Sequence, residues 1–510
     1  MVSTGAAGLG LAGSSGFGGV LLAAPEVGRG GVNGYQAWCW RSLPLDQRTG
    51  SQVFQALYGH HLSQPASLAT LAVLLESPYP LPDLAPSRHS RYSLCGGPPR
   101  WRGNRPRLWT PPLGQVLSSL ADRLREGEPR SLPKTAVDPT LPFTGGWLGW
   151  LGYDLAWEIE RLPVLKADPL PFPVALWYEP ETFAVLDHTD QRLWLAAASN
   201  QALDAMAAQV LILNSEKPVI EPVMVTGQPS PLHFGLSASA YQRAVQQAQD
   251  YIRAGDVFQV NLSLRFSTQT PSHSWSLYRQ LQQINPSPFA CYWHTPWGDV
   301  ISCSPERLVQ LQGQTVETRP IAGTRPRGSS SSQDQHHRTT LLNHPKEKAE
   351  HIMLVDLERN DLGRVCTWGS VQVNELLTLE YYSHVMHLVS NVTGQLAVGK
   401  NAVDLIRAVF PGGTITGCPK VRCMEIIEEL EPVRRSLFYG ACGYLDHRGN
   451  LDLNILIRTL LWSYPTESSL ARVWGQVGAG IVADSEPERE WLESLQKAKA
   501  QLLALGFSLH

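Results

Sequence analysis

The sequence has little that would build a disulfide framework, a zinc site or a nucleic-acid-binding surface. Its 510 residues include only 8 Cys, and no two of them form a CxxC pair. The 42 Lys+Arg residues are balanced by 45 Asp+Glu, which leaves a formal net charge of −3. Nucleic-acid-binding domains normally carry a basic face. These absences exclude a zinc ribbon or a thioredoxin-like site, argue against nucleic acid as a partner, and indicate thiols in a reducing, cytoplasmic compartment.

A membrane-spanning run and a secretory signal are also missing. Residues 1–34 hold 11 of the 43 glycines, so Gly and Ser interrupt any apolar stretch that could cross a bilayer. No basic residue precedes the apolar positions, as a signal peptide requires. Gly8, Gly10 and Gly13 match the dinucleotide pattern GxGxxG, but no strand precedes them and a glycine-rich stretch produces this pattern by chance. We predict a disordered leader over 1–34.

The remaining chain has a globular composition, with 43% hydrophobic and 17% charged residues. In 35–231 the apolar runs are short, and the run Phe143–Asp154 alternates glycines with large aromatics, which predicts a bent strand in a packed sheet. In 232–510 longer helices alternate with strands, beginning with a helix at 237–254 and a strand at 257–266. The Ser/Gln-rich stretch 325–337 is interpreted as a mobile surface loop.

Two acidic pairs lie on predicted helices. Glu347 and Glu350 are three residues apart, as are Glu490 and Glu493, so each pair occupies one helix face. Four carboxylates converging from two helices would suit Mg²⁺, which prefers oxygen ligands. The alternative is that these residues are solvated or paired with nearby Lys and Arg.

Other segments could bind an anion or move a proton. The glycine-rich turn 411–417 leads into a helix, whose first backbone N–H groups can bind an anion, although it equally resembles a plain loop-to-helix joint. The backbone at Gly478–Gly480 could contact a carboxylate, and Arg458 could clamp one. His387 could accept a proton near neutral pH, or be a core histidine.

Taken together, these blocks resemble the chorismate-utilising enzymes, in particular the component I subunits of anthranilate and aminodeoxychorismate synthases. The resemblance runs from about Tyr241 to Leu505, and it is looser in the amino-terminal half. It implies an α+β fold in which two layered β-sheets with flanking helices enclose the site, with 35–231 and 232–510 interleaved into one architecture. Its blocks are Gly255-Asp-Val-Phe-Gln-Val-Asn-Leu-Ser, Ser304-Pro-Glu-Arg, Thr318-Arg-Pro-Ile-Ala-Gly-Thr, Val355-Asp-Leu-Glu-Arg-Asn-Asp, Met424-Glu-Ile-Ile-Glu-Glu-Leu and Gly478-Ala-Gly-Ile-Val-Ala-Asp.

The resemblance also implies roles for individual residues. Glu350 and Glu493 would bind Mg²⁺, with Glu347 and Glu490 in support, and the cation would hold the ring carboxylate of chorismate. His387 would move the ring proton, and Glu306 would assist departure of the ring hydroxyl, with Thr324 as a further catalytic position. The residues expected to bind the substrate are Arg458, Gly478, Ala479, Gly480, Ala322, Gly323, Thr414 and Lys497.

Two amine products remain open at this point. Many aminodeoxychorismate synthases have a lysine at the position of Ala322, whereas anthranilate synthases have alanine there, so Ala322 favours anthranilate. The segments 145–149, 259–263, 411–417 and 453–459 look more like the aminodeoxychorismate branch, and we predict that product first. A non-catalytic paralogue that binds chorismate or tryptophan is a third alternative.

Two further expectations concern regulation and partners. Residues resembling a tryptophan-binding pocket are Glu76, Ser77, Asn285, Pro286 and Ser287. None of the cysteines lies in the Gly-x-Cys-x-Gly turn of a glutaminase, and Cys442 comes nearest. We therefore expect ammonia to come from a separate glutamine amidotransferase subunit, component II.

Overall fold

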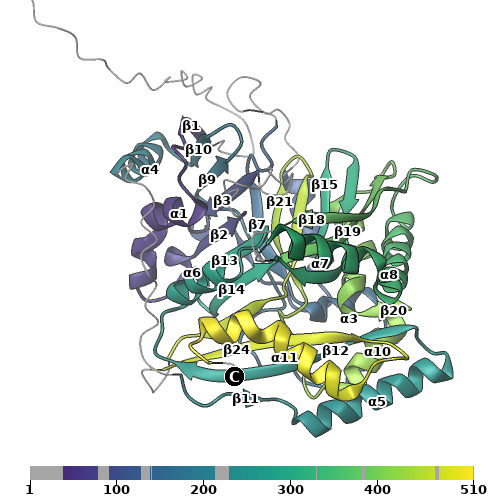
Figure 1. Cartoon of the computed structure of the whole chain (residues 1–510). Helices are drawn as coiled ribbons and strands as arrows, with labels where there is room; N and C mark the ends of the chain where they lie inside the picture. The colour runs from purple at the N-terminus through teal and green to yellow at the C-terminus, as the bar shows by residue number, and fades with distance from the viewer. Residues whose placement is uncertain are drawn as a thin grey trace, which may run out of the picture.

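Helices and antiparallel sheets are combined in an α+β fold, which confirms the fold class predicted from the sequence (Figure 1). The computed structural model describes residues 38–77, 91–127, 138, 140–212, 229–328, 330–381, 385–465 and 470–508. The leader 1–34 and the side chains of Ala322 and Thr324 lie outside this description.

The larger sheet has 12 strands among the described residues: β1 (Cys39–Pro44), β2 (Ala72–Glu76), β3 (Tyr92–Gly96), β9 (Thr182–Asp187), β10 (Arg192–Ala197), β11 (His233–Phe234), β12 (Gln259–Thr270), β13 (Phe289–Thr295), β14 (Gly298–Ser304), β20 (Gly417–Cys418), β23 (Thr459–Ser463) and β24 (Ala471–Ile481). Their order is β1-β10-β9-β3-β2-β13-β14-β23-β24-β12-β11, and β20 pairs with β12.

The second sheet has 10 strands in the described part of the chain: β6 (Leu108–Trp109), β7 (Gly146–Leu151), β8 (Ala175–Tyr178), β15 (Arg307–Gln312), β16 (Thr315–Thr318), β17 (Ile321–Pro326), β18 (Gln372–Tyr381), β19 (Val385–Gln395), β21 (Ala441–Asp446) and β22 (Leu451–Ile455). Their order is β17-β19-β16-β15-β22-β21-β7-β8-β6, with β18 paired to β19. A separate hairpin joins β4 (Trp101–Arg102) to β5 (Arg105–Pro106).

The helices of the described segments are α1 (Gly50–Tyr58), α2 (Val116–Gly127), α3 (Ala156–Ile159), α4 (Asn200–Ile212), α5 (Ala238–Ala254), α6 (Ser274–Ile284), α7 (Ser331–Asn343), α8 (Pro345–Gly363), α9 (Ala402–Val409), α10 (Lys420–Leu430) and α11 (Pro487–Ala504). Helix α5 matches the prediction for 237–254: Ser237 caps its first turn by accepting from the Ala240 N–H, and Gly255 ends it in the left-handed conformation at φ 83°.

Both sheets combine strands from the two halves of the chain. In the larger sheet β2 pairs with β13, and in the second sheet β7 pairs with β21. Side chains from both sheets form one apolar cluster that contains the buried rings of Trp147, Trp150 and Trp293. The two sheets also meet at Cys291 on β13 and Cys442 on β21, whose sulfur atoms are 3.4 Å apart. Because each half completes sheets of the other, neither would bury its own apolar faces alone.

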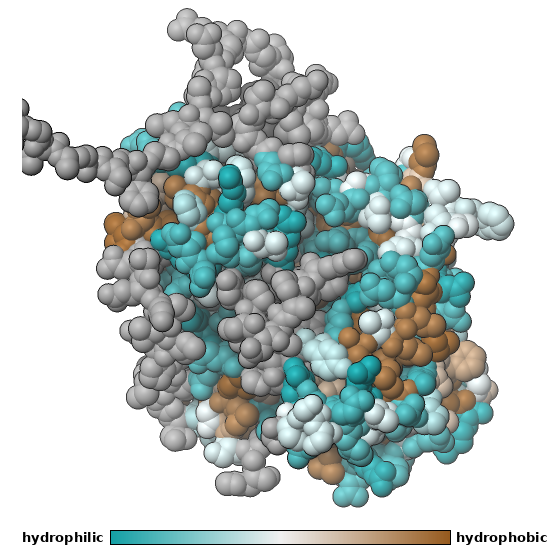
Figure 2. Space-filling view, turned by 45° about the horizontal axis from the view of Figure 1, so that its top comes forward, coloured by the Kyte–Doolittle hydropathy of each residue, from teal (hydrophilic) through white to brown (hydrophobic). Residues whose placement is uncertain are grey.

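Helices cover the outer faces of the layered sheets (Figure 1). Side chains of α1, α4, α6 and α11 share an apolar cluster with strands of the larger sheet. Helices α5 and α10 pack against β12 and β24, and α7 and α8 lie against β17 and β19. Figure 2 shows a face on which hydrophilic residues predominate and hydrophobic residues gather in separate patches.

The structure corrects the prediction of a loop at 325–337, and it also bears on the expectations for the cysteines and for membrane-spanning helices. The stretch 325–337 was expected to be a mobile loop, but Arg325 and Pro326 end β17, and most of the rest belongs to α7. The Ser330 side chain caps this helix by accepting from the Gln333 N–H, and Leu341 is buried beneath it. All eight cysteines are free thiols. None of the helices in the described residues is long and apolar enough to cross a membrane.

Strand β7, which lies between β21 and β8, depends on a glycine that lets two strands approach closely. A Cβ atom at Gly149 would lie 2.3 Å from the Leu176 carbonyl oxygen and 2.3 Å from the Trp177 ring. We therefore expect Gly149→Ala to lower the free energy of unfolding by roughly 1–3 kcal/mol through overpacking, measured as a lower Tm. The control is Gly363→Ala at the end of α8, where a Cβ meets nothing within 4 Å. Equal Tm values for the two variants would contradict this account.

Candidate active site

The first component of the site is the long pairing of β12 with β24. Gly478 and Gly480 lie opposite Ser263 and Asn261 in this pairing. A Cβ at Gly478 would lie 2.4 Å from the Leu262 carbonyl oxygen, and one at Gly480 would lie 2.3 Å from the Gln259 side-chain amide. Gly478 therefore has no room for a side chain against the β12 backbone, whereas a side chain at Gly480 would have to displace the Gln259 amide.

A buried hydroxyl and a lysine flank this backbone. The hydroxyl of Tyr439 would lie 3.0 Å from a Cβ at Gly478, and it is buried with no hydrogen-bond partner in the described structure. The Lys497 amine donates to the Gly478 carbonyl oxygen at 3.0 Å. A buried hydroxyl without a partner marks a place where a polar ligand could bind.

Arg458 stands between β22 and β23 in the left-handed conformation, at φ 52°. This backbone conformation is costly for a residue with a side chain and is often associated with functional sites. One Nη atom donates to the Lys497 carbonyl oxygen at 2.8 Å, and no ion pair to Arg458 is formed within the described residues. Burial lowers the pKa of its guanidinium, while the charges of Tyr439 and Glu493 raise it. A guanidinium stays charged in proteins, and with one donor used by Lys497, Arg458 has further donors for an anion.

His387 lies on β19, opposite Thr324 of β17 and Glu380 of β18. Its side chain is buried, and burial together with the charge of Arg458 lowers the imidazole pKa to about 4. The ring is consequently neutral at physiological pH and can accept a proton. The structure thus places the predicted base close enough to Arg458 to be affected by its charge.

Glu306 lies between β14 and β15, in a segment held by backbone contacts. The Ser304 hydroxyl donates to the Ile455 carbonyl oxygen at 2.6 Å, and the Ile455 N–H donates to the Glu306 carbonyl oxygen at 3.0 Å. Burial raises the pKa of the Glu306 carboxyl to about 7, and the facing hydroxyl of Thr414 lowers it in part. A carboxylic acid of this kind holds its proton near neutral pH and can act as a general acid.

The four candidate metal ligands occupy α8 and α11, as predicted. Glu347 pairs with Arg325 at 2.7 Å through one oxygen, and its other oxygen is buried without a hydrogen-bond partner. Glu493 pairs with Lys497 at 2.7 Å, and Glu490 is buried. In the described ranges no three His, Cys, Asp or Glu side chains come close enough to hold a metal ion. The donors suit a hard cation, but Glu493 would have to leave Lys497, so the four-carboxylate set stays a prediction.

One acidic residue near the site was not predicted from the sequence. Glu358 lies on α8, eleven residues or about three turns after Glu347, and only 7% of its surface is exposed. One of its oxygens would lie 3.7 Å from a Cβ at Gly413. Continuing the helical spacing from Glu347 along α8 could have found it.

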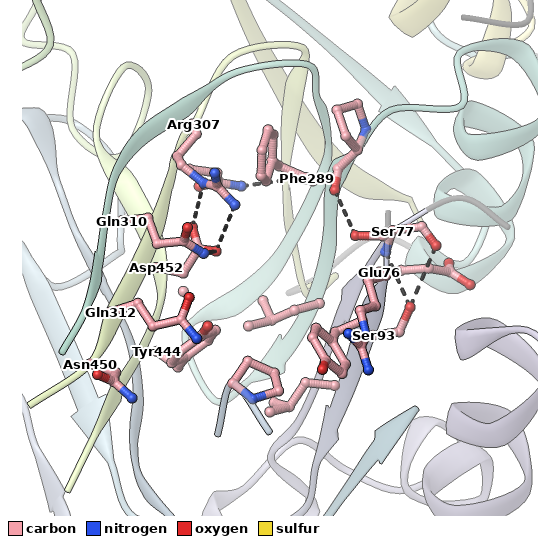
Figure 3. Close-up of a pocket in the computed structure, with 18 of the residues that line it drawn as sticks. Glu76, Ser77, Ser93, Phe289, Arg307, Gln310, Gln312, Tyr444, Asn450 and Asp452 are labelled. Atoms are coloured by element: carbon pink, nitrogen blue, oxygen red, sulfur yellow. Dashed lines mark hydrogen bonds and ion pairs between the residues drawn. The ribbon is translucent and has the colours of Figure 1, made fainter. Parts of the chain in front are cut away.

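The structure contains a separate cavity of about 400 Å³ between the sheets (Figure 3). Apolar and aromatic side chains form one wall, and Arg307, Gln310 and Asp452 form a polar one. Arg307 is held by Asp452 at 2.9 Å. The aromatic and apolar residues lining the cavity are Leu75, Tyr92, Leu94, Phe289, Leu311 and Tyr444.

Only part of the expected tryptophan pocket lines this cavity. Glu76 and Ser77 do, followed along the chain by Pro288 and Phe289. The Glu76 carboxylate, however, accepts from Ser51, Tyr278 and Gln282, which hold it toward α1 and α6. The other three expected residues, Asn285, Pro286 and Ser287, do not line the cavity. The Asn285 side chain instead donates to the Ser287 hydroxyl and to the Cys303 carbonyl oxygen.

This fold and this arrangement of carboxylates, arginine and glycine-bearing strand agree with comparisons of the whole sequence. The chain belongs to the chorismate binding enzyme family, whose match covers residues 108–503. The resemblance predicted from the sequence is thereby confirmed.

Individual relatives carry both of the names considered above. An anthranilate synthase component I-like protein of Synechocystis sp. is 55% identical over 500 residues, which cover 97% of this chain and 98% of that protein. The aminodeoxychorismate synthase component 1 of Bacillus subtilis is 46% identical over 373 residues, covering 72% of this chain and 78% of the relative. The crystal structure of anthranilate synthase component I from Streptococcus pneumoniae has a TM-score of 0.66 at 31% identity, covering 84% of this chain and 95% of that one.

Proposed function

We propose that this chain aminates chorismate with ammonia in a Mg²⁺-dependent reaction, and that the product is 4-amino-4-deoxychorismate. The observation that carries the proposal is the combination of a neutral buried imidazole at His387, a charged arginine at Arg458 and a protonated carboxyl at Glu306. Chorismate is a dianion with a ring hydroxyl that must leave, so it needs an anion clamp, an acid and a base together.

The two carboxylates of the substrate would be bound in different ways. Arg458, with the backbone of Gly478–Gly480, would hold the enolpyruvyl carboxylate, because its guanidinium has donors free of any ion pair in the described structure. Glu350 and Glu493, supported by Glu347 and Glu490, would hold Mg²⁺, which when bound supplies the positive charge that the ring carboxylate requires. The buried, unpartnered oxygen of Glu347 supports this assignment.

Two residues would handle protons. Glu306 would give its proton to the departing ring hydroxyl, so that water leaves in place of hydroxide. Its pKa near 7 keeps the proton available at physiological pH. The His387 imidazole, which is neutral because its pKa lies near 4, would accept a proton from the ring in a reaction whose product has lost that ring proton.

The preferred product is inferred from segments of the sequence, two of which lie on or beside β12. Gln259 begins β12 beside Gly480, the turn 411–417 lies against β12 through β20, and β7 with its glycines pairs with β21. These are the segments that resemble the aminodeoxychorismate branch. Anthranilate is the alternative product, and Ala322 favours it because no lysine is present there to attack the ring. Ammonia would come from a separate glutamine amidotransferase subunit.

The product assay uses the purified chain with chorismate, MgCl₂ and ammonium. We expect 4-amino-4-deoxychorismate, converted to p-aminobenzoate by an added lyase and identified by liquid chromatography. Removing Mg²⁺ with EDTA should abolish turnover, and adding Mg²⁺ back should restore it.

Three outcomes of this assay would contradict the proposal. Anthranilate formed without any added lyase would favour the alternative product. Turnover with glutamine as the sole nitrogen source would contradict the separate amidotransferase subunit. Full activity after removal of Mg²⁺ would contradict the metal requirement.

A second proposal concerns the 400 Å³ cavity. We propose that it binds an aromatic amino acid, with tryptophan as the first candidate. Its size is within the range of small-molecule sites, and it combines an aromatic wall with a few polar groups. Glu76 and Ser77, which resemble a tryptophan-binding element, lie at its edge.

The cavity proposal predicts that tryptophan raises the Tm of the chain, because a ligand that binds only the folded state stabilises it. Gln312 is an exposed residue of the cavity wall, so Gln312→Trp should narrow the entrance and weaken this shift while amination continues. A Tm that stays constant up to millimolar tryptophan would contradict the proposal, as would an undiminished shift in the variant.

A further inference from the structure

A buried arginine that the proposed reaction does not use lies just after α10. Arg435 is 1% exposed. Its charge is balanced by Glu431 at the end of that helix, which accepts from Nε at 3.0 Å and from Nη2 at 2.6 Å. Well-packed apolar side chains often fill such a space at no greater cost than a buried ion pair. Stability alone therefore does not account for the Glu431–Arg435 pair.

The same guanidinium holds two backbone segments of the candidate site. Its Nη1 donates to the Ile415 carbonyl oxygen of the turn 411–417 at 2.8 Å, and its Nη2 donates to the Asn261 carbonyl oxygen of β12 at 2.8 Å. Asn261 lies opposite Gly480 in the pairing of β12 with β24. Because the planar fork of a guanidinium fixes the directions of its donors, Arg435 sets the turn and the strand at a defined separation.

Glu431 extends these contacts to a second position on β12. One of its oxygens accepts from the Ser263 N–H at 2.8 Å and from the Ser263 hydroxyl at 2.7 Å. Ser263 lies opposite Gly478, as Asn261 lies opposite Gly480. The Glu431–Arg435 pair therefore holds β12 at both of the positions that face the candidate ligand-binding backbone of β24.

Arg435 also contacts the rings of two tyrosines. Its Cζ atom is 4.6 Å from the centre of the Tyr439 ring and 4.7 Å from the centre of the Tyr153 ring. A desolvated guanidinium over an aromatic ring is attracted by the π electrons. Tyr439 has a left-handed backbone conformation at φ 65°, which is costly for a residue with a side chain and persists only where its surroundings enforce it. The contact with Arg435 is one such constraint.

The Tyr439 hydroxyl is the group through which this network reaches the site. It is buried without a hydrogen-bond partner in the described structure, and it would lie 3.0 Å from a Cβ at Gly478. Burial raises the pKa of this hydroxyl, so it keeps its proton and can donate. An unused donor beside Gly478 suits the same carboxylate that Arg458 would bind.

We propose that Arg435, with Glu431, is a positioning residue that aims the Tyr439 hydroxyl at the carboxylate held by Arg458 and the backbone of Gly478–Gly480. The inference rests on the proposed function, because that carboxylate belongs to chorismate. Arg435 acts without touching the substrate, since all three of its side-chain nitrogens already donate to a carboxylate or to backbone carbonyl oxygens. A hydroxyl held in place before binding loses less entropy when the substrate arrives.

The binding test is a double-mutant cycle measured by calorimetric titration of chorismate with MgCl₂ and without ammonium. Tyr439→Phe keeps the ring but removes the hydroxyl, and we expect chorismate to bind about 10- to 100-fold more weakly. Arg435→Lys keeps the charge but loses the fork, and it should weaken binding by a similar factor. Residues that act as one unit are not additive. Adding Tyr439→Phe to Arg435→Lys should therefore change Kd by less than about threefold.

The matched control is Arg422→Lys on α10. Arg422 also binds a carboxylate, that of Asp256 at 2.7 Å, and lies over the ring of Tyr251 at 5.0 Å, but it is partly exposed. Its replacement should leave chorismate affinity unchanged. Additive effects of Arg435→Lys and Tyr439→Phe would overturn the inference, because the arginine would then support the fold without acting through the hydroxyl. Wild-type affinity in Arg435→Lys would overturn it as well.

A second test needs no substrate, so it separates this inference from the proposed function. Fluorotyrosine placed only at Tyr439 reports the order of that ring by fluorine NMR. We expect one narrow resonance in wild type and a broadened or doubled one in Arg435→Lys, recorded well below the Tm of the variant. Glu431→Gln replaces Arg435→Lys in both tests if that variant does not fold.

The two tests have distinct outcomes. The same narrow fluorine resonance in wild type and variant would overturn the inference, whatever product the chain makes. A ring that is ordered in wild type and loses its order in the variant, in a chain that does not bind chorismate, would support the positioning of Tyr439 and contradict the proposed function.

Discussion

The antiparallel pairing of β12 with β24 is the contact on which the site depends. It joins Val260–Thr270 to Ala471–Ile481, segments about two hundred residues apart. Gly478 allows this approach, because a Cβ there would lie 2.4 Å from the Leu262 carbonyl oxygen of β12. The helix that follows β24 carries Glu490, Glu493 and Lys497, so the same pairing sets the position of one predicted half of the metal site.

Burial is the main cause of the pKa shifts in the candidate site. Burial lowers the pKa of the His387 imidazole and raises the pKa of the Glu306 and Glu358 carboxyls, and it also lowers the pKa of the Arg458 guanidinium, a group that stays charged in proteins. The base, the acid and the anion clamp proposed for His387, Glu306 and Arg458 could therefore operate at the same pH. His387 lies on the second sheet, and Glu306 and Arg458 lie where the chain passes from a strand of one sheet to a strand of the other.

The sequence predicted the helices around the four glutamates, the glycine-rich strand at β7 and the fold class, because spacing, glycine content and family resemblance are local or ordered signals. It did not predict α7, since a Ser/Gln-rich stretch looks like a loop until Ser330 is recognised as a cap. It also missed Glu358, because the raised pKa of that acid is caused mainly by its burial in the folded chain, which the sequence pattern does not show. The pairing of Glu493 with Lys497 is the alternative that the spacing in the sequence left open for this carboxylate.

The central claim is that the carboxylates of α8 and α11 bind a cation that in turn binds the substrate. Calorimetric titration of chorismate with and without Mg²⁺ tests it most directly, in wild type, in Glu493→Gln and in the control Glu429→Gln, whose carboxylate pairs with Tyr251 on the surface. Mg²⁺ should tighten chorismate binding at least tenfold, or about 1.4 kcal/mol, in wild type and the control, and have no effect in Glu493→Gln. Equal affinity with and without Mg²⁺ in wild type would contradict the account.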